Sequence, residues 1–318
     1  MSEAQTIESV SHFVEVLASG ETNRREHLDG NVSSGTFYRG QADVSWLLSP
    51  SLYRSGLFPK ERALISEIQR IRPEEFESGS RFDRLVKMQH YGLPTRLLDV
   101  TINPLVALYF ACEAEERDGS VFVFRNLPVF WQHNYAVRLI MLYAFEFAGP
   151  KVDVGRFIEV ALRDPIVSAH FADSDSLART ATHYLTEVPV MAVRPSLSNQ
   201  RIAQQQGAFL VFGMTLGERS VSTNPGTVGR VYLDLQPIPA TRNPENLWHA
   251  SAEYRIPAAN KLGMRRTLRH LGVTRSRLFP ELEHQAAFVR DTFMAQLLDA
   301  RDLDGGTEDS LDGGSHGA

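Results

Sequence analysis

Apolar residues recur three or four positions apart in several long stretches, which is the spacing of one face of an α-helix. The first such stretch covers residues 7–18. A second begins at Pro59 and ends before Pro73, because proline cannot continue a helix. The same spacing predicts further helices over residues 131–147, 154–163, 177–185, 260–271 and 280–299.

Short apolar runs between these helices predict β-strands. They cover residues 35–41, 121–124, 188–193, 208–212, 229–235 and 254–256. Strands and helices do not alternate regularly, since long helical blocks separate groups of strands. The sequence therefore predicts an α+β fold with a mixed or antiparallel sheet core, and not a doubly wound parallel sheet.

The order of these elements predicts one main domain with an insertion. We expect an N-terminal helix and loop over residues 1–34, a domain over 35–301 and a helical insertion at about 128–187. A chain of 318 residues, 43% of them hydrophobic, can bury the core that such a domain needs. Residues 302–318 are rich in Gly, Asp and Ser, so we expect them to form a disordered tail.

Composition narrows the classes of function. The net charge is −5, so no overall basic excess indicates nucleic-acid binding, although a local basic groove remains compatible with it. Cys112 is the single cysteine and lies in an apolar helix, which predicts an inert buried thiol and excludes an intramolecular disulfide. The ten histidines show no ligand spacing, so no metal is predicted.

Membrane and export signals are missing from the pattern. Residues 1–8 are polar and acidic, unlike a signal peptide. The most apolar stretch, residues 139–148, falls short of the roughly 20 residues that span a bilayer. We expect a soluble cytoplasmic protein without a membrane partner.

Residues 89–101 concentrate polar side chains between two helices. Gly92 is predicted to end the first helix, with His90 and Tyr91 in its final turn. Asn103 is predicted to cap the second helix, with Pro104 as its first residue. Polar groups that are fixed between two core elements are typical of a functional site.

Arginine, histidine and aspartate supply the candidate chemistry. His90 with Asp99 is the minimum for general acid–base catalysis. Arg39, at the end of a predicted strand, can present a planar fork to a phosphate or carboxylate, and Gly40 would let a ligand approach the backbone. Structural roles remain open: His90 capping helix carbonyls, Arg39 paired with a buried Asp99, or Arg96 paired with Asp99 to fix the loop.

Two further polar runs are weaker candidates. The three amides of residues 204–206 precede Gly207 and can hydrogen-bond a ribose or a base, although a plain polar loop also explains them. A basic helix and loop is more often a solvated face than a nucleic-acid contact. Its cationic residues are Lys261, Arg265, Arg266, Arg269 and Arg275.

Four motifs occur in order along the chain. They are Tyr38-Arg39-Gly40-Gln41, the run 89–99 continued by residues 103–111, the run 199–209, and residues 278–283. In these residues the chain resembles the FRG domain family, which is named for its aromatic-Arg-Gly motif. The resemblance spans about residues 37–289, and one departure is Val100, where the family more often has Trp.

The resemblance implies a remote similarity to the ADP-ribosyltransferase fold, with NAD as substrate. By that analogy Arg39 would bind NAD, and Tyr91 or Tyr109 would stack on nicotinamide. A late strand of that fold usually supplies a catalytic Glu, but residues 204–206 contain none. Asp99 or another acid would then replace it, or the domain would bind a nucleotide without turnover.

Two hypotheses follow from the resemblance. The first is an NAD-dependent ADP-ribosyltransferase-like bacterial effector of a toxin or phage-defence system, which modifies nucleic acid or protein through Arg39, His90 and Asp99. The second is a non-catalytic nucleotide- or ligand-binding sensor module, whose helical insertion contacts a protein partner. The residues expected to contact NAD are Tyr38, Arg39, Gly40, Gln41, Tyr91, Arg96, Tyr109, Gln205 and Gln206.

Overall fold

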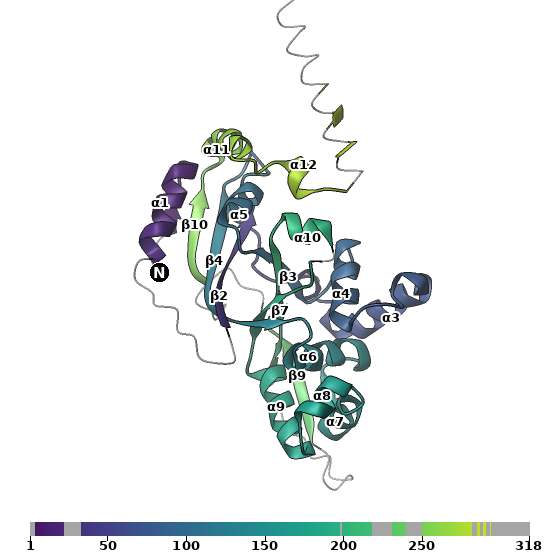
Figure 1. Cartoon of the computed structure of the whole chain (residues 1–318). Coiled ribbons are helices and arrows are strands. Elements are labelled where there is room, and N and C mark those ends of the chain that lie inside the picture. Colours follow the sequence, from purple (N-terminus) through teal and green to yellow (C-terminus); the bar gives the residue numbers. More distant parts are fainter. Residues whose placement is uncertain are drawn as a thin grey trace, which may run out of the picture.

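A mixed β-sheet with helices on both sides forms the centre of the protein (Figure 1). The computed structural model describes residues 4–21, 33–197, 199–217, 231–239, 250–281, 285–286, 289–290 and 293. The tail predicted over residues 302–318 lies outside these residues, as does most of the helix predicted over 280–299.

Seven strands of the described residues form the main sheet in the order β1-β10-β4-β2-β3-β7-β6. The pairs β1–β10 and β4–β6 are parallel, and the other pairs are antiparallel, which confirms the predicted α+β fold with a mixed sheet. The bounds are β1 (Gln5–Thr6), β2 (Ser33–Gln41), β3 (Leu97–Thr101), β4 (Gly119–Trp131), β6 (Val190–Arg194), β7 (Gly207–Phe212) and β10 (Ala250–Ile256).

Strand β4 is long enough to pair along two different parts of its length. Its residues 119–124 lie between β10 and β2, whereas residues 129–131 pair with β6. Strands β4, β2, β3, β7 and β6 therefore close into a ring. The closure explains why residues far apart in the chain, such as those of β2 and β7, lie around one centre.

Side chains on β4 alternate between two hydrophobic clusters, as the two-residue period of a strand requires. Val121 and Val123 belong to one cluster, and Phe122 and Phe124 belong to the other. The valine side is covered by α1 (Val10–Glu21), α5 (Pro104–Ala111) and α11 (Ala258–His270), followed by the short α12 (Arg275–Leu278). Figure 1 shows α1 and α11 beside β10.

The phenylalanine side is covered by a larger group of helices (Figure 1). They are α2 (Ser51–Arg54), η1 (Phe58–Lys60), α3 (Glu61–Ile71), η2 (Pro73–Glu75), α4 (Arg81–His90), α6 (Tyr135–Glu146), α7 (Val154–Ala161), α8 (Pro165–His170) and α9 (Ser174–Thr186), while α10 (Gln200–Gln204) precedes β7. A small second sheet joins them in the order β5-β9-β8, formed by β5 (Lys151–Asp153), β9 (Tyr232–Pro237) and β8 (Met214–Leu216).

The helix predicted over residues 131–147 begins later than expected. Residues up to Trp131 remain in β4, because Trp131 pairs with Arg194 of β6. Asn134 then caps α6 by accepting a hydrogen bond from the backbone N–H of Ala136 at 2.9 Å. The predicted helical insertion at 128–187 therefore starts inside a sheet strand and also contains the short β5.

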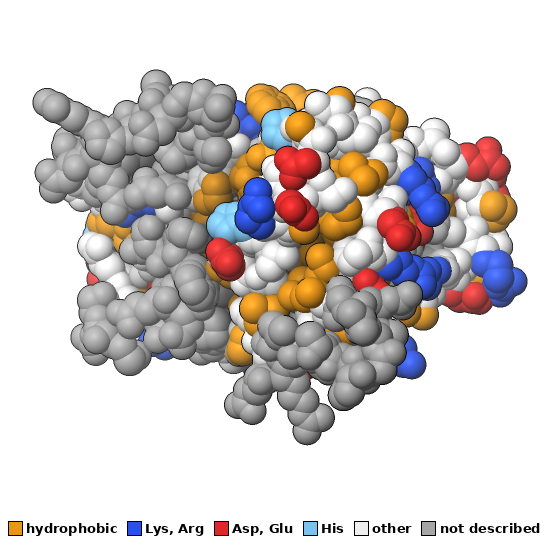
Figure 2. Space-filling view, turned by 90° about the horizontal axis from the view of Figure 1, so that it is seen from below, with side chains coloured by type: hydrophobic (Ala, Val, Ile, Leu, Met, Phe, Trp, Pro, Cys, Tyr) orange, Lys and Arg blue, Asp and Glu red, His pale blue; other side chains and the backbone are white. Residues whose placement is uncertain are grey.

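The end of the molecule that carries these helices has a mixed surface. Figure 2 shows acidic and basic side chains interspersed with apolar ones on this face. A protein partner of the insertion stays a prediction. No helix in the described part of the chain is long and apolar enough to cross a bilayer.

The helix ends around the motif of residues 89–104 follow the predictions. Gly92, at φ 87°, follows the end of α4, and the N–H of Leu93 donates back to the carbonyl of Met88 at 3.0 Å. Asn103 caps α5, with its Oδ1 2.9 Å from the Leu105 nitrogen, and Pro104 is the first helical residue.

Candidate functional site

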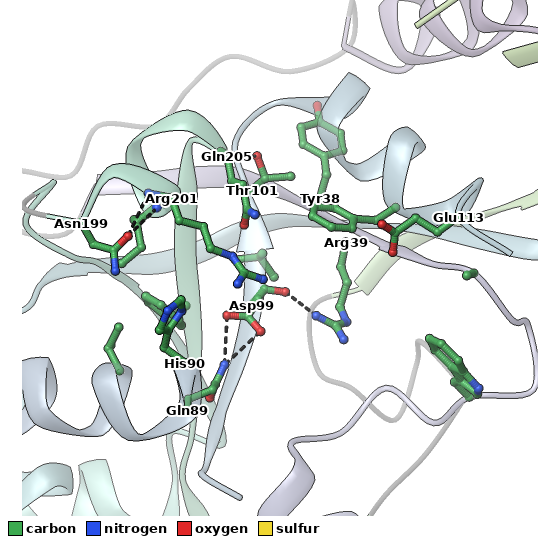
Figure 3. A pocket seen from close by; sticks show the side chains of 18 residues that line it. Tyr38, Arg39, Gln89, His90, Asp99, Thr101, Glu113, Asn199, Arg201 and Gln205 are labelled. Atoms are coloured by element: carbon green, nitrogen blue, oxygen red, sulfur yellow. Dashed lines mark hydrogen bonds between the residues drawn. The ribbon is translucent and has the colours of Figure 1, made fainter. Parts of the chain in front are cut away.

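A cleft of about 310 Å³ lies where β2, β3, α4, α10 and the end of α5 meet. Its lining combines charged, amide and aromatic side chains, which Figure 3 shows from close by. The lining residues that matter below are Arg39, Trp46, Gln89, His90, Asp99, Phe110, Glu113, Asn199, Arg201 and Gln205.

Arg39 reaches the cleft from β2. Its Nη1 donates a hydrogen bond to the backbone carbonyl oxygen of Asp99 at 2.6 Å. Its Nε is buried and has no hydrogen-bond partner among the described residues. Burial lowers the pKa of this guanidinium, and the negative charge of Asp99 opposes that effect. An enclosed donor without a partner is the group that an anionic ligand could satisfy.

Asp99 presents its carboxylate to the cleft from the middle of β3. The residue is exposed, whereas its strand neighbours Leu98 and Val100 are buried. Both carboxylate oxygens accept from Nε2 of Gln89 at 2.9 Å. The Gln89 Oε1 in turn accepts from the Thr95 hydroxyl, which fixes the direction of the amide. Asp99 is therefore an oriented carboxylate (Figure 3).

His90 and Arg201 share one acidic neighbour at the opposite side of the cleft. Oε1 of Glu281 lies 4.0 Å from Nε2 of His90 and 3.7 Å from Nη1 of Arg201. Oε2 of Glu281 is buried and has no partner among the described residues. His90 thus faces the Glu281 carboxylate.

Glu113 supplies a second carboxylate to the cleft, just after α5. More than a third of the residue is exposed, yet the loss of solvent around its carboxyl raises the pKa. The positive charges of Arg275, Arg265 and Arg201 oppose this rise, in that order. Three cations therefore lie within electrostatic reach of this acid.

The amide side chains in the lining also form hydrogen bonds that stabilise the structure. Oδ1 of Asn199 caps α10 by accepting from the Arg201 nitrogen at 2.8 Å. Nε2 of Gln205 donates to the Leu278 carbonyl at 3.0 Å. Both side chains stabilise the wall of the cleft through these hydrogen bonds. This supports a structural role for the polar run, although both residues also line the cleft.

The family model of the FRG domain matches residues 34–120. This part of the chain is an FRG domain. The matched range contains Arg39, His90, Asp99 and Glu113, so it builds most of the cleft. No curated protein and no solved structure matches the chain.

Arg96 of the FRG motif does not reach the cleft. The side chain is fully buried and forms an ion pair with Glu61, to which its Nε donates at 2.8 Å. The predicted pair between Arg96 and Asp99 is wrong, as is the expected NAD contact of Arg96. The two residues are three positions apart along an extended chain, so their side chains point to opposite faces.

The two tyrosines proposed to stack on nicotinamide lie outside the lining of the cleft. Tyr91 is 70% exposed and packs edge-on against His90 with the ring centroids 5.2 Å apart. Tyr109 is buried in the cluster under α5, and burial raises its pKa. Neither placement supports the predicted stacking role.

Gly40 lines the cleft, and its ligand contact stays a prediction. Its small size also has a structural role, because a Cβ on Gly40 would lie 1.8 Å from the Ala107 carbonyl oxygen where α5 packs on β2. Tyr38 touches the cleft but packs in the same cluster as α5. Gln41 is buried away from the lining, and its Nε2 donates to the Leu47 carbonyl at 3.4 Å.

Gln206 does not line the cleft. Its φ of 47° lies in the left-handed region, and its carbonyl accepts from the Ile102 nitrogen at 3.1 Å. Gln205 is therefore the residue of this pair that reaches the site.

Sequence reasoning missed Trp46, Phe110 and Glu113 in the lining. Trp46 is 49% exposed, although it is a large aromatic residue directly after the Arg-Gly strand. Glu113 is the first acid after an apolar helix that begins in the main motif. Proximity to the two motifs was the available signal for both. No group of His, Cys, Asp or Glu in the described ranges is arranged to hold a metal ion.

Proposed function

We propose that the cleft binds NAD and that this FRG-domain protein is an ADP-ribosyltransferase-like enzyme that releases nicotinamide. The observation that carries the proposal is the unit formed by Arg39 and Asp99. A guanidinium with an unpartnered buried Nε and an oriented carboxylate lie on neighbouring strands, and the guanidinium donates one hydrogen bond to the backbone carbonyl of Asp99. The guanidinium can bind a phosphate, and the carboxylate can stabilise a cationic transition state.

In the proposed reaction the bond between ribose C1′ and the nicotinamide nitrogen breaks, and its electron pair leaves with nicotinamide. Asp99 stabilises the positive charge that develops on the ribose. An acceptor nucleophile or water then bonds to C1′ and gives up a proton, for which His90 is the candidate base. Arg39 and Arg201, which both line the cleft, hold the pyrophosphate.

Carboxylates in the cleft support this proposal despite the missing acid at residues 204–206. Asp99 and Glu113 both line the cleft, so negative charge is present near any bound ribose. Asp99 is the better candidate for the stabilising role, because the two hydrogen bonds from Gln89 fix its position before a ligand arrives.

Nicotinamide release from NAD by the purified protein tests the proposal. Asp99→Asn keeps the shape and removes the charge, so turnover should fall by about 100-fold or more while NAD still binds. Arg39→Ala should weaken NAD binding by about tenfold or more, because it removes a hydrogen bond to a charged group.

Arg62→Ala is the matched control, since Arg62 is an exposed arginine on α3 outside the cleft. It should release nicotinamide at the wild-type rate, and circular dichroism should show that all three variants are folded. Wild-type turnover by Asp99→Asn would remove Asp99 from the mechanism, and wild-type behaviour of both cleft variants would overturn the proposal.

A non-catalytic nucleotide sensor is the second candidate. It is favoured by residues 204–206, which contain no acid where the resembled fold usually supplies its catalytic Glu. A rise in melting temperature with NAD or another nucleotide, without any product, would support it. The role in toxin or phage-defence systems stays a prediction of the family resemblance.

A further inference from the structure

Residues 257–280 contain no Asp or Glu, although the whole chain has a net charge of −5. This segment comprises α11, a short turn and α12. A strong local excess of positive charge within an acidic protein is a feature that the overall composition conceals. The arginines of the segment are Arg265, Arg266, Arg269, Arg275 and Arg277.

Four of these arginines form what we call the basic surface: Arg266, Arg269, Arg275 and Arg277. All four are exposed, and no carboxylate of the described residues forms an ion pair with them. Arg265 is different, because its Nη1 lies 2.8 Å from Oε1 of Glu115. Glu115 thus neutralises one arginine of the segment and leaves the basic surface charged.

The basic surface continues into the cleft through Phe279. The guanidinium carbons of Arg275 and Arg201 lie 6.0 Å and 4.7 Å from the centroid of its ring. Phe279 also packs edge-on against Phe110, with the centroids 6.0 Å apart, and Phe110 lines the cleft. The charge of Arg275 is the largest of those opposing the raised pKa of Glu113.

Hydrogen bonds from Lys261 connect α11 to the cleft wall. Its side chain is fully buried, and Nζ donates to the carbonyls of Ala42 at 2.7 Å and Ala114 at 2.5 Å. Ala42 lines the cleft and Ala114 follows Glu113. Helix α11 is therefore held in a fixed position relative to the site.

We propose that the basic surface binds single-stranded nucleic acid and leads it into the cleft. Exposed arginines on two consecutive helices can pair with the repeated phosphates of a strand. Trp46 is an exposed aromatic residue in the lining, and an unpaired base can stack on its ring. A duplex or an acidic protein has no unpaired base to place there. That the strand is also the acceptor of ADP-ribose rests on the proposed function, whereas the binding does not.

Fluorescence anisotropy with labelled single-stranded RNA and DNA of one sequence, the matched duplex and poly-glutamate tests this inference, in salt from about 50 to 200 mM. Wild-type protein should bind the single strands more tightly than the duplex or poly-glutamate, and more weakly as salt rises. The RNA and DNA arms show which strand is preferred. No NAD is present, so failure here is distinct from failure of the proposed function.

Two double variants locate the surface: Arg266→Ala/Arg269→Ala and Arg275→Ala/Arg277→Ala. Each should weaken single-strand binding by about tenfold or more and flatten the log–log salt slope by about 1.4, since each lost phosphate contact removes about 0.7. The control Arg62→Ala/Arg179→Ala removes the same charge from exposed positions on α3 and α9 and should bind like wild type. Equal losses in the control, no wild-type binding at low salt, or equally tight binding of poly-glutamate would overturn the inference.

Discussion

Burial decides what each arginine of the FRG motifs does. Arg96 is fully enclosed, with Glu61 at its guanidinium and the ring of Tyr143 5.2 Å away. Arg39 is only partly enclosed and keeps an Nε without a partner in the described residues. The first arginine is satisfied by the protein itself, while the second has binding capacity left for a ligand.

Removing either member of the buried pair should therefore destabilise the fold. Arg96→Ala or Glu61→Ala leaves an uncompensated charge in the core and should lower the free energy of unfolding by about 3–5 kcal/mol. Urea denaturation measures this change. Arg70→Ala breaks the exposed pair with Glu67 and should cost less than about 1 kcal/mol. Similar losses in the buried and the exposed pair would contradict the structural role of Arg96.

Helix α5 packs so closely on the sheet that two strands have no room for side chains beneath it. Gly40 on β2 faces the carbonyl of Ala107, and Gly119 on β4 faces that of Ala111, where a Cβ would lie 2.2 Å from the oxygen. The same helix begins at Pro104, directly after the motif that supplies Asp99. This close packing thus fixes the position of α5 on β2, the strand that carries Arg39.

Gly40→Ala should push α5 off the sheet. Because the added Cβ meets backbone and not a flexible side chain, the free energy of unfolding should fall by about 3 kcal/mol or more. Gly263→Ala is a suitable control, since that position lies within α11 and has open space around it. It should stabilise the protein by up to about 1 kcal/mol. A neutral Gly40→Ala in thermal or urea unfolding would disprove the packing argument.

At the scale of the whole molecule, the sheet separates two hydrophobic clusters, and the only cysteine of the sequence lies within the smaller one. Cys112 is fully buried, and its Sγ lies 3.9 Å from Sδ of Met264 on α11. Burial raises the pKa of the thiol to about 12, while Lys261 and Arg265 oppose the shift. The predicted inert thiol is consistent with this environment.

This buried thiol should make stability depend on alkaline pH. The unfolded chain loses the Cys112 proton near its ordinary pKa of 9.0, whereas the folded chain keeps it up to about 12. Between these values the unfolded state binds fewer protons, so the free energy of unfolding falls as pH rises. Urea denaturation of Cys112→Ala at about pH 8–10 should show a shallower fall, by up to about 1.4 kcal/mol per pH unit. Parallel profiles for the variant and wild type would exclude this contribution.

The sequence by itself determined the features that depend on neighbouring residues. Gly92 ended α4 and Asn103 with Pro104 began α5 as predicted, because helix caps are local interactions. Local patterning misplaced the start of α6, since the pairing of Trp131 with distant β6 kept those residues in a strand. Apolar periodicity cannot register such a long-range pairing.

Tertiary structure alone decided which motif residues face the cleft. That choice depends on the alternation of side chains along paired strands, which turned Asp99 toward the cleft and Arg96 into the core. It also depends on contacts between residues far apart in the chain, such as Arg39 with Asp99 and Arg201 with Phe279. Motif spacing pointed to residues that line the cleft, whereas the geometry of the cleft came from the closure of the sheet and the packing of α5.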